Sequence, residues 1–102
     1  MITHNIYATL HYAGGDRGTE AGQLWRKRVD LNYIIPIGYR IELRGGVSLT
    51  LDGAPTIHLD TGEVSAFFGT VVELKDLKTR EARVRDFIQN GFTIVKDYEK
   101  WK

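Results

Sequence analysis

Arginines dominate the side chains of this sequence that could bind or act on another molecule. Arg26 and Arg28 stand beside Trp25, and Arg40 and Arg44 follow at similarly short spacing. The guanidinium group presents planar donors that suit phosphate and carboxylate groups. A neighbouring aromatic ring can stack on a base. The pattern therefore predicts a site for an anionic, nucleotide-like ligand, built from six residues: Trp25, Arg26, Arg28, Tyr39, Arg40 and Arg44.

These arginines also have a simpler interpretation. Asp30 and Glu42 occur in the same alternating rows, so the arginines could serve only in cross-strand ion pairs on a solvated sheet face. The ligand hypothesis depends on a specific pairing of strands, which the ion-pair interpretation does not need. It requires the strand that carries Arg26 and Arg28 to pair with the strand that carries Arg40 and Arg44, through a turn at Pro36 and Gly38.

Histidines and carboxylates offer a second kind of chemistry. His58 and Asp60 are two positions apart, and Glu63 or His11 could complete a metal site. This spacing is also typical of an ordinary hairpin on the surface. A serine nucleophile would need a G-x-S-x-G elbow, which surrounds neither candidate, Ser48 nor Ser65. We therefore predict no catalytic residue, metal or cofactor, and keep a small metal-dependent hydrolase or nuclease as an alternative.

Glycines gather in one segment near the N-terminus. Residues 13–23 contain four glycines in the run AGGDRGTEAG, which predicts a flexible loop. The segment lacks the Lys-Ser/Thr pair that ends a phosphate-binding P-loop, and a strand rather than a helix is expected after it. At the other end of the chain, residues 96–102 form a charged tail.

Composition sets limits on the class of protein. The chain has 102 residues, 42% of them hydrophobic and 26% charged, which predicts a single soluble domain over residues 1–102. It has no cysteine, so disulfides and thiolate metal sites are excluded, and a cytoplasmic location is expected. A net charge of +1 argues against nucleic acid as the main partner. No apolar run is long enough for a membrane helix.

Hydrophobic periodicity predicts the elements that must position these side chains. Period-two alternation indicates strands over residues 5–12, 24–33, 39–44, 47–52, 57–59, 63–75 and 92–95, with Gly45-Gly46 as a two-residue hairpin turn and a bulge near Gly69. Residues 77–90 change to helical period, with an apolar face of Leu77, Val84, Phe87 and Ile88 and a stop at Asn90-Gly91. The expected fold is α+β and mainly β. It is a small antiparallel sheet or partly open barrel of six or seven strands, with one helix from the C-terminal half packed on it.

Aromatic residues exceed what one small core can hide. The surplus predicts that some lie at an interface, the candidates being Tyr7, Tyr12, Tyr39, Phe67, Phe68, Tyr98 and Trp101. Exposed strand edges favour self-association as well, so a homo-oligomer is expected. These aromatics also support an alternative function, a protein-interaction module or inhibitor of a host protein.

The Pro-Gly interrupted strand and the closing helix-Asn-Gly-Phe-strand element, residues 84–95, suggest a broader likeness. In style the chain resembles small accessory proteins encoded by bacteriophages. That resemblance implies an oligomeric binder, which in some such proteins blocks host defence by capturing a partner or a nucleotide signal. From the residues and the resemblance together, the expected function is non-enzymatic capture of a nucleotide-like anion.

Overall fold

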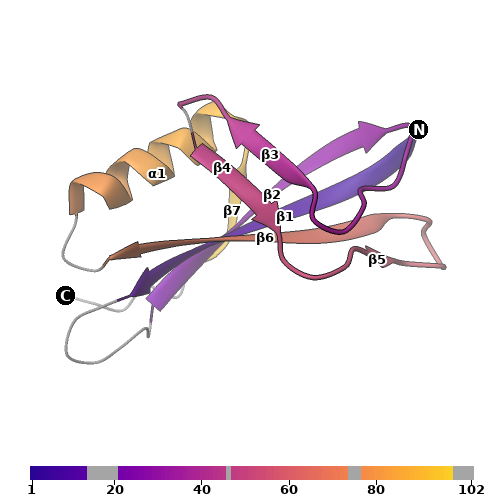
Figure 1. Cartoon of the computed structure of the whole chain (residues 1–102), viewed down its shortest axis with the longest axis horizontal. Helices are drawn as coiled ribbons and strands as arrows, with labels where there is room; N and C mark the ends of the chain where they lie inside the picture. Colours follow the sequence, from indigo (N-terminus) through magenta and orange to yellow (C-terminus); the bar gives the residue numbers. More distant parts are fainter. Residues whose placement is uncertain (14–20, 46, 74–76, 98–102) are drawn as a thin grey trace.

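The structure, a computed structural model, describes residues 1–13, 21–45, 47–73 and 77–97. These residues form strands and a single helix in the predicted order, six strands, the helix and a last strand (Figure 1). The strands are β1 (Ile2–Ala13), β2 (Ala21–Leu31), β3 (Arg40–Leu43), β4 (Val47–Leu51), β5 (Thr56–Ile57), β6 (Val64–Glu73) and β7 (Thr93–Asp97), and the helix is α1 (Leu77–Gln89). The predicted small, mainly β domain with one helix is confirmed.

The sheet is mixed and unclosed. Its order is β3-β4-β6-β1-β2-β7, and β5 pairs with β6 on the same side as β4. The central strand β1 runs antiparallel to β2 but parallel to β6, with His4 opposite Val64 and Tyr7 opposite Phe67. The sheet is therefore not purely antiparallel. A parallel pair needs a long crossover connection, and the β2-to-β5 segment supplies it.

Alternation along β1 separates two faces of the sheet. Ile6, Ala8 and Leu10 point to the inner face and are at most 6% exposed. Asn5 and Tyr7 point to the opposite, outer face and are only partly buried. Because neighbouring strands are in register, each of them continues this division.

The β3–β4 hairpin curls over the inner face. Leu43 and Leu49 from this hairpin join Ile6 and Phe68 in one hydrophobic core. Side chains of β2 and β3 line a common cavity of about 200 Å³, although these strands lie far apart in the sheet order. Figure 1 shows the hairpin lying across the long strands. The sheet is thus strongly curved, with its apolar side inside the curve.

Helix α1 packs on the inner face through one aromatic anchor. Phe87 is 1% exposed, and its ring centroid lies 5.5 Å from that of Trp25 and 5.4 Å from that of Phe92. The predicted contact of Ile88 is wrong, because this side chain is 59% exposed. A helical face is narrow, so a position one residue past the anchor turns toward solvent.

The predicted helix stop is confirmed. Gly91 has a φ of 84°, which is the left-handed region that glycine favours. The amide of Gly91 donates to the Ile88 carbonyl at 3.1 Å, and the amide of Phe92 donates to the Phe87 carbonyl at 2.9 Å. These two bonds and the Phe87–Phe92 ring contact form a Schellman motif.

Asn90 joins the end of α1 to the β3–β4 hairpin. Its Oδ1 accepts from the Arg44 amide at 2.9 Å, and its Nδ2 donates to the Arg44 and Asp86 carbonyls. Lys27 reaches the same place, where its Nζ donates to the Asn90 carbonyl at 2.6 Å. A cation at a helix C-terminus is favourable, which explains a lysine on the apolar side of β2.

A buried histidine fixes the segment between β2 and β3. His4 is fully buried on the inner face, and its Nε2 accepts the amide proton of Ile35 at 3.3 Å. Its Nδ1 lies 3.0 Å from the Ile2 carbonyl, so the ring donates there. Ile35 is fully buried beside it. Residues 32–39 are thus anchored to β1. The predicted turn at Pro36 and Gly38 is present, with the Tyr39 amide donating to the Pro36 carbonyl at 3.2 Å, but it does not join β2 and β3 in a hairpin.

Several predicted boundaries change. No bulge interrupts the β1–β6 register at Gly69; the shift among the described strands lies between Leu24 and Trp25, where β2 meets β7. Leu43 pairs with Val47, which separates the hairpin partners by three residues rather than two. Parts of the predicted loop 13–23 and tail 96–102 belong to β1, β2 and β7, and the remaining residues, 14–20 and 98–102, lie outside the described ranges.

Helix α1 is short and polar. It has 13 residues, several of them charged. Among the described residues no helix is long and apolar enough to cross a membrane.

Candidate anion-binding face of the sheet

Arg26 and Arg28 lie together on the outer face of β2, as predicted from their alternation. Both are exposed, Arg28 with 64% of its side chain accessible. Their Cα partners on β1 are Tyr7 and Asn5, respectively. The two side chains therefore project from the same side of the strand, with their Cα atoms roughly 7 Å apart along it.

Trp25 does not belong to this site. It is 4% exposed on the inner face, where its Nε1 donates to the Gln23 side-chain oxygen at 3.3 Å and its ring packs on Phe87. Neighbouring residues on a strand point to opposite faces. Because Trp25 and Arg26 are adjacent in the strand, the indole lies on the face opposite to Arg26 and cannot stack on a ligand bound there.

Arg40 and Arg44 are not adjacent to Arg26 and Arg28. The predicted pairing of their strands is wrong, because β4, β6 and β1 separate β3 from β2. Four strand spacings place Arg40 on the order of 19 Å from β2 along the sheet. Arg44 follows β3 at the hairpin turn, where its backbone binds Asn90 while its side chain is exposed.

Tyr39 has a structural contact instead of a place among the arginines. Its hydroxyl lies 2.8 Å from that of Tyr33, and the ring centroids are 6.3 Å apart. This hydrogen bond, partial burial and the charge that Tyr33 would carry raise the pKa of Tyr39 above its ordinary value. The pair closes the 32–39 segment across its two ends.

An aromatic pair takes the place that Trp25 was expected to fill. Tyr7 and Phe67 stack on the outer face, with ring centroids 4.8 Å apart and an angle of 12° between the planes. Phe67 remains 47% exposed. Register puts Arg26, Tyr7 and Phe67 in one row across β2, β1 and β6. Both aromatics were among the interface candidates, whereas Phe68, another candidate, is buried in the core. The pairing of β1 with β6 brings Tyr7 and Phe67 together.

Acidic residues balance the charge of this face. Glu63 Oε1 lies 3.6 Å from Arg28 Nη2 and accepts a hydrogen bond from Asn5 Nδ2 at 2.9 Å. Asp30, two residues beyond Arg28, accepts from the Thr3 hydroxyl at 2.9 Å. The Arg28–Glu63 distance is too long for a hydrogen bond, so the donors of Arg28 stay available for a ligand. Among the described residues Arg26 is in no ion pair.

His58, the histidine of the alternative hydrolase hypothesis, contacts Ser65, which was considered separately as a nucleophile. His58 Nε2 lies 2.8 Å from Ser65 Oγ, where β5 leads into its turn and pairs with β6. Ser65 is 8% exposed. Within the described part of the chain, no three His, Asp or Glu side chains gather closely enough to hold a metal ion. This contact therefore links the turn after β5 to β6.

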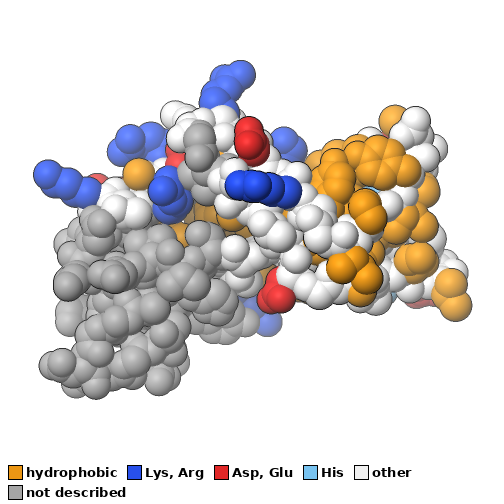
Figure 2. Space-filling model, in the orientation of Figure 1, with side chains coloured by type: hydrophobic (Ala, Val, Ile, Leu, Met, Phe, Trp, Pro, Cys, Tyr) orange, Lys and Arg blue, Asp and Glu red, His pale blue; other side chains and the backbone are white. Residues whose placement is uncertain are grey.

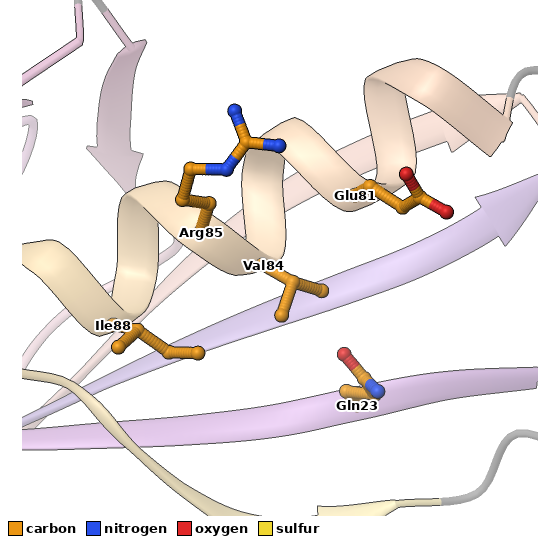
Figure 3. A pocket seen from close by; sticks show the side chains of 5 residues that line it. All are labelled: Gln23, Glu81, Val84, Arg85 and Ile88. Carbon is orange, nitrogen blue, oxygen red and sulfur yellow. The ribbon is translucent and has the colours of Figure 1, made fainter.

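A shallow cavity of about 350 Å³ lies between α1 and β2 (Figure 3). Val84 and Ile88 from the helix face Gln23 from β2, and Glu81 and Arg85 stand at the rim. The surface of the described lining residues is mainly apolar. Among the described residues that line it, Arg85 is the one cation.

Comparison with protein-family models, with curated proteins and with solved structures finds no significant match. The predicted likeness to phage-encoded proteins stays a prediction, as does a cytoplasmic location.

Proposed function

We propose that this protein is a non-enzymatic binding protein that captures a nucleotide-like anion on the outer face of its sheet. The observation that supports the proposal is the row of Arg26, Tyr7 and Phe67, with Arg28 beside it. This row combines cationic donors with an exposed aromatic surface on three adjacent strands.

The aromatic part of the row suits a base. Phe67 is half-exposed, and Tyr7 supports its ring from the neighbouring strand. Stacking of a base on an aromatic side chain contributes about 1–3 kcal/mol and tolerates different bases.

The cationic part suits a phosphate. Arg26 lies two strand spacings from Phe67, roughly 10 Å between Cα atoms. This is the scale on which a nucleotide separates its base from its phosphate groups. Arg28 is close enough to Arg26 along β2 for both to approach one phosphoryl group with charge-assisted hydrogen bonds.

Glu63 moderates the affinity for an anion. A ligand phosphate near Arg28 is attracted by the guanidinium and repelled by the Glu63 carboxylate. Glu63 Oε1 is 3.6 Å from Arg28 Nη2. A mononucleotide bearing two phosphates should bind more tightly than an uncharged nucleoside, and salt should weaken both arginine contacts because the face is exposed to solvent.

Amide chemical shifts in NMR test where the ligand binds. AMP, ADP, inorganic phosphate and adenosine are titrated separately into the ¹⁵N-labelled protein. We expect AMP and ADP to shift amides of residues 5–9, 26–28 and 65–67, with smaller effects from phosphate and adenosine. Shifts confined to the inner cavity, at Val29 and Ile41, or no shift with any of the four probes would overturn the proposal.

A further inference from the structure

We infer that a second copy of this chain docks on an apolar surface at one end of the molecule. The surface consists of five exposed side chains, which we call the apolar end: Tyr33, Ile34, Ile37, Ile57 and Leu59. Figure 2 shows hydrophobic side chains gathered at the end of the molecule where β5 and the N-terminus lie. A surface of this kind on a small protein marks an interaction site.

Exposure at the apolar end is large. Ile37 is 75% exposed and Leu59 94%, while Ile57 and Ile34 are 48% and 42% exposed. The hydrophobic core consists of other apolar side chains, which are almost fully buried. The five side chains of the apolar end are therefore not part of the core. They project to solvent from two separate segments, residues 32–39 and 53–59.

Hydrogen bonds hold both segments in place. In the first, Ile35 binds His4 through its amide, and the Tyr33 and Tyr39 hydroxyls meet at 2.8 Å. In the second, the His58 amide donates to the Glu63 carbonyl at 2.8 Å, and the His58 ring contacts Ser65. A surface that is already ordered loses little conformational entropy on binding.

Strand register brings one residue of each segment, Ile57 and Ile35, to the same side of the sheet. Ile57 pairs with Val64, Val64 pairs with His4, and His4 binds Ile35. Val64 and His4 both point to the inner face and are fully buried. This row links Ile57 of the second segment to Ile35 of the first, on the side of the sheet opposite to Arg26 and Arg28.

The charge pattern favours a second copy as the occupant. Residues 32–39 and 53–59 contain no Asp, Glu, Lys or Arg, although 26% of the whole chain is charged. An uncharged apolar surface is complementary to itself, and a net charge of +1 per chain gives little repulsion between copies. A two-fold symmetric dimer buries the same surface on both subunits, and it leaves the outer face of each subunit open.

Sedimentation velocity and light scattering test the dimer, over protein concentrations from about 1 µM to about 1 mM. We expect the mass to rise from 11.6 kDa toward twice that value. Ile37→Glu and Leu59→Glu should weaken the dimer by at least about tenfold, because each places a charge in the apolar contact. Ile88→Glu is the matched control, since Ile88 is 59% exposed on α1, and should leave the dimer unchanged.

Amide shifts on dilution show where the contact lies. They should occur in residues 32–39 and 53–62, and the circular dichroism spectrum of each variant should match that of the wild type. A monomer throughout the concentration range would overturn the inference. So would a dimer that tolerates both glutamates, or dilution shifts confined to the free edge of β7.

Discussion

The ring of Tyr7 stacks on the ring of Phe67, although the two residues are 60 positions apart in the chain, with 4.8 Å between their centroids. The contact exists because β1 and β6 pair in parallel with Tyr7 opposite Phe67. It gives the open side of the sheet an ordered aromatic surface. Phe68, the next residue, points to the core and is 1% exposed.

This adjacent pair gives a first prediction. Phe67→Ala should lower the free energy of unfolding by about 1.5 kcal/mol or less, since the ring is half-exposed and mainly contacts Tyr7. Phe68→Ala should lower it by about 3–5 kcal/mol, because it leaves a cavity in the core. Urea denaturation measures both. Equal losses would contradict the assignment of the two faces.

A second prediction concerns the buried histidine. His4→Ala should lower the free energy of unfolding by about 2–5 kcal/mol, because it leaves a cavity and removes the acceptor of the Ile35 amide. His58→Ala is the control at an exposed position and should cost about 1 kcal/mol. A His4 variant as stable as the wild type would show that residues 32–39 are not held by this side chain.

Much of the local structure was predictable from the sequence. Alternation correctly separated Trp25 and Val29 from Arg26 and Arg28, and Asn90-Gly91 correctly marked the end of α1. These features depend on residues within one turn or one strand. Local periodicity contains that information directly.

The candidate site was only partly predictable. Alternation shows which side chains share a face, but not which strands become neighbours. Pro36 and Gly38 suggested a hairpin between β2 and β3, yet burial of Ile35 against His4 carries the segment across the inner face instead. As a result Arg40, which was predicted to belong to the site, lies outside it, and Phe67, which was not predicted there, belongs to it. Neither result can be derived from local periodicity, because both depend on the long-range pairing of β1 with β6.

The tyrosine pair leads to a third prediction, on pH. The hydrogen bond with Tyr33 raises the pKa of Tyr39, so Tyr33→Phe should lower the Tyr39 pKa toward its ordinary value. Because the folded-state pKa is the higher one, the bond stabilises the fold below the ordinary tyrosine pKa, and this contribution is lost as the pH rises through the raised value. NMR titration of the tyrosine ring carbons measures the shift. An unchanged Tyr39 titration in the variant would refute the contact.

A fourth prediction uses the carboxylate beside Arg28. Glu63→Gln removes the negative charge but keeps an oxygen that can accept from Asn5. We expect this variant to bind AMP more tightly than the wild type, by a factor of about 2–5 at low salt, and the gain should disappear at high salt. Weaker binding would mean that Glu63 itself contacts the ligand.

Calorimetric titration of ADP into the wild type, Arg26→Ala and Arg40→Ala tests the central claim most directly. Arg26 and Arg40 are both exposed arginines on strands, but only Arg26 lies in the row with Tyr7 and Phe67. Arg26→Ala should lose about 1.5–3 kcal/mol of binding free energy, at least about tenfold in Kd, without a change in unfolding free energy. Arg40→Ala should change Kd by less than about twofold, because β4, β6 and β1 separate its strand from β2 and it is not in the row. Equal losses in the two variants, or no heat of binding with the wild type, would contradict the account.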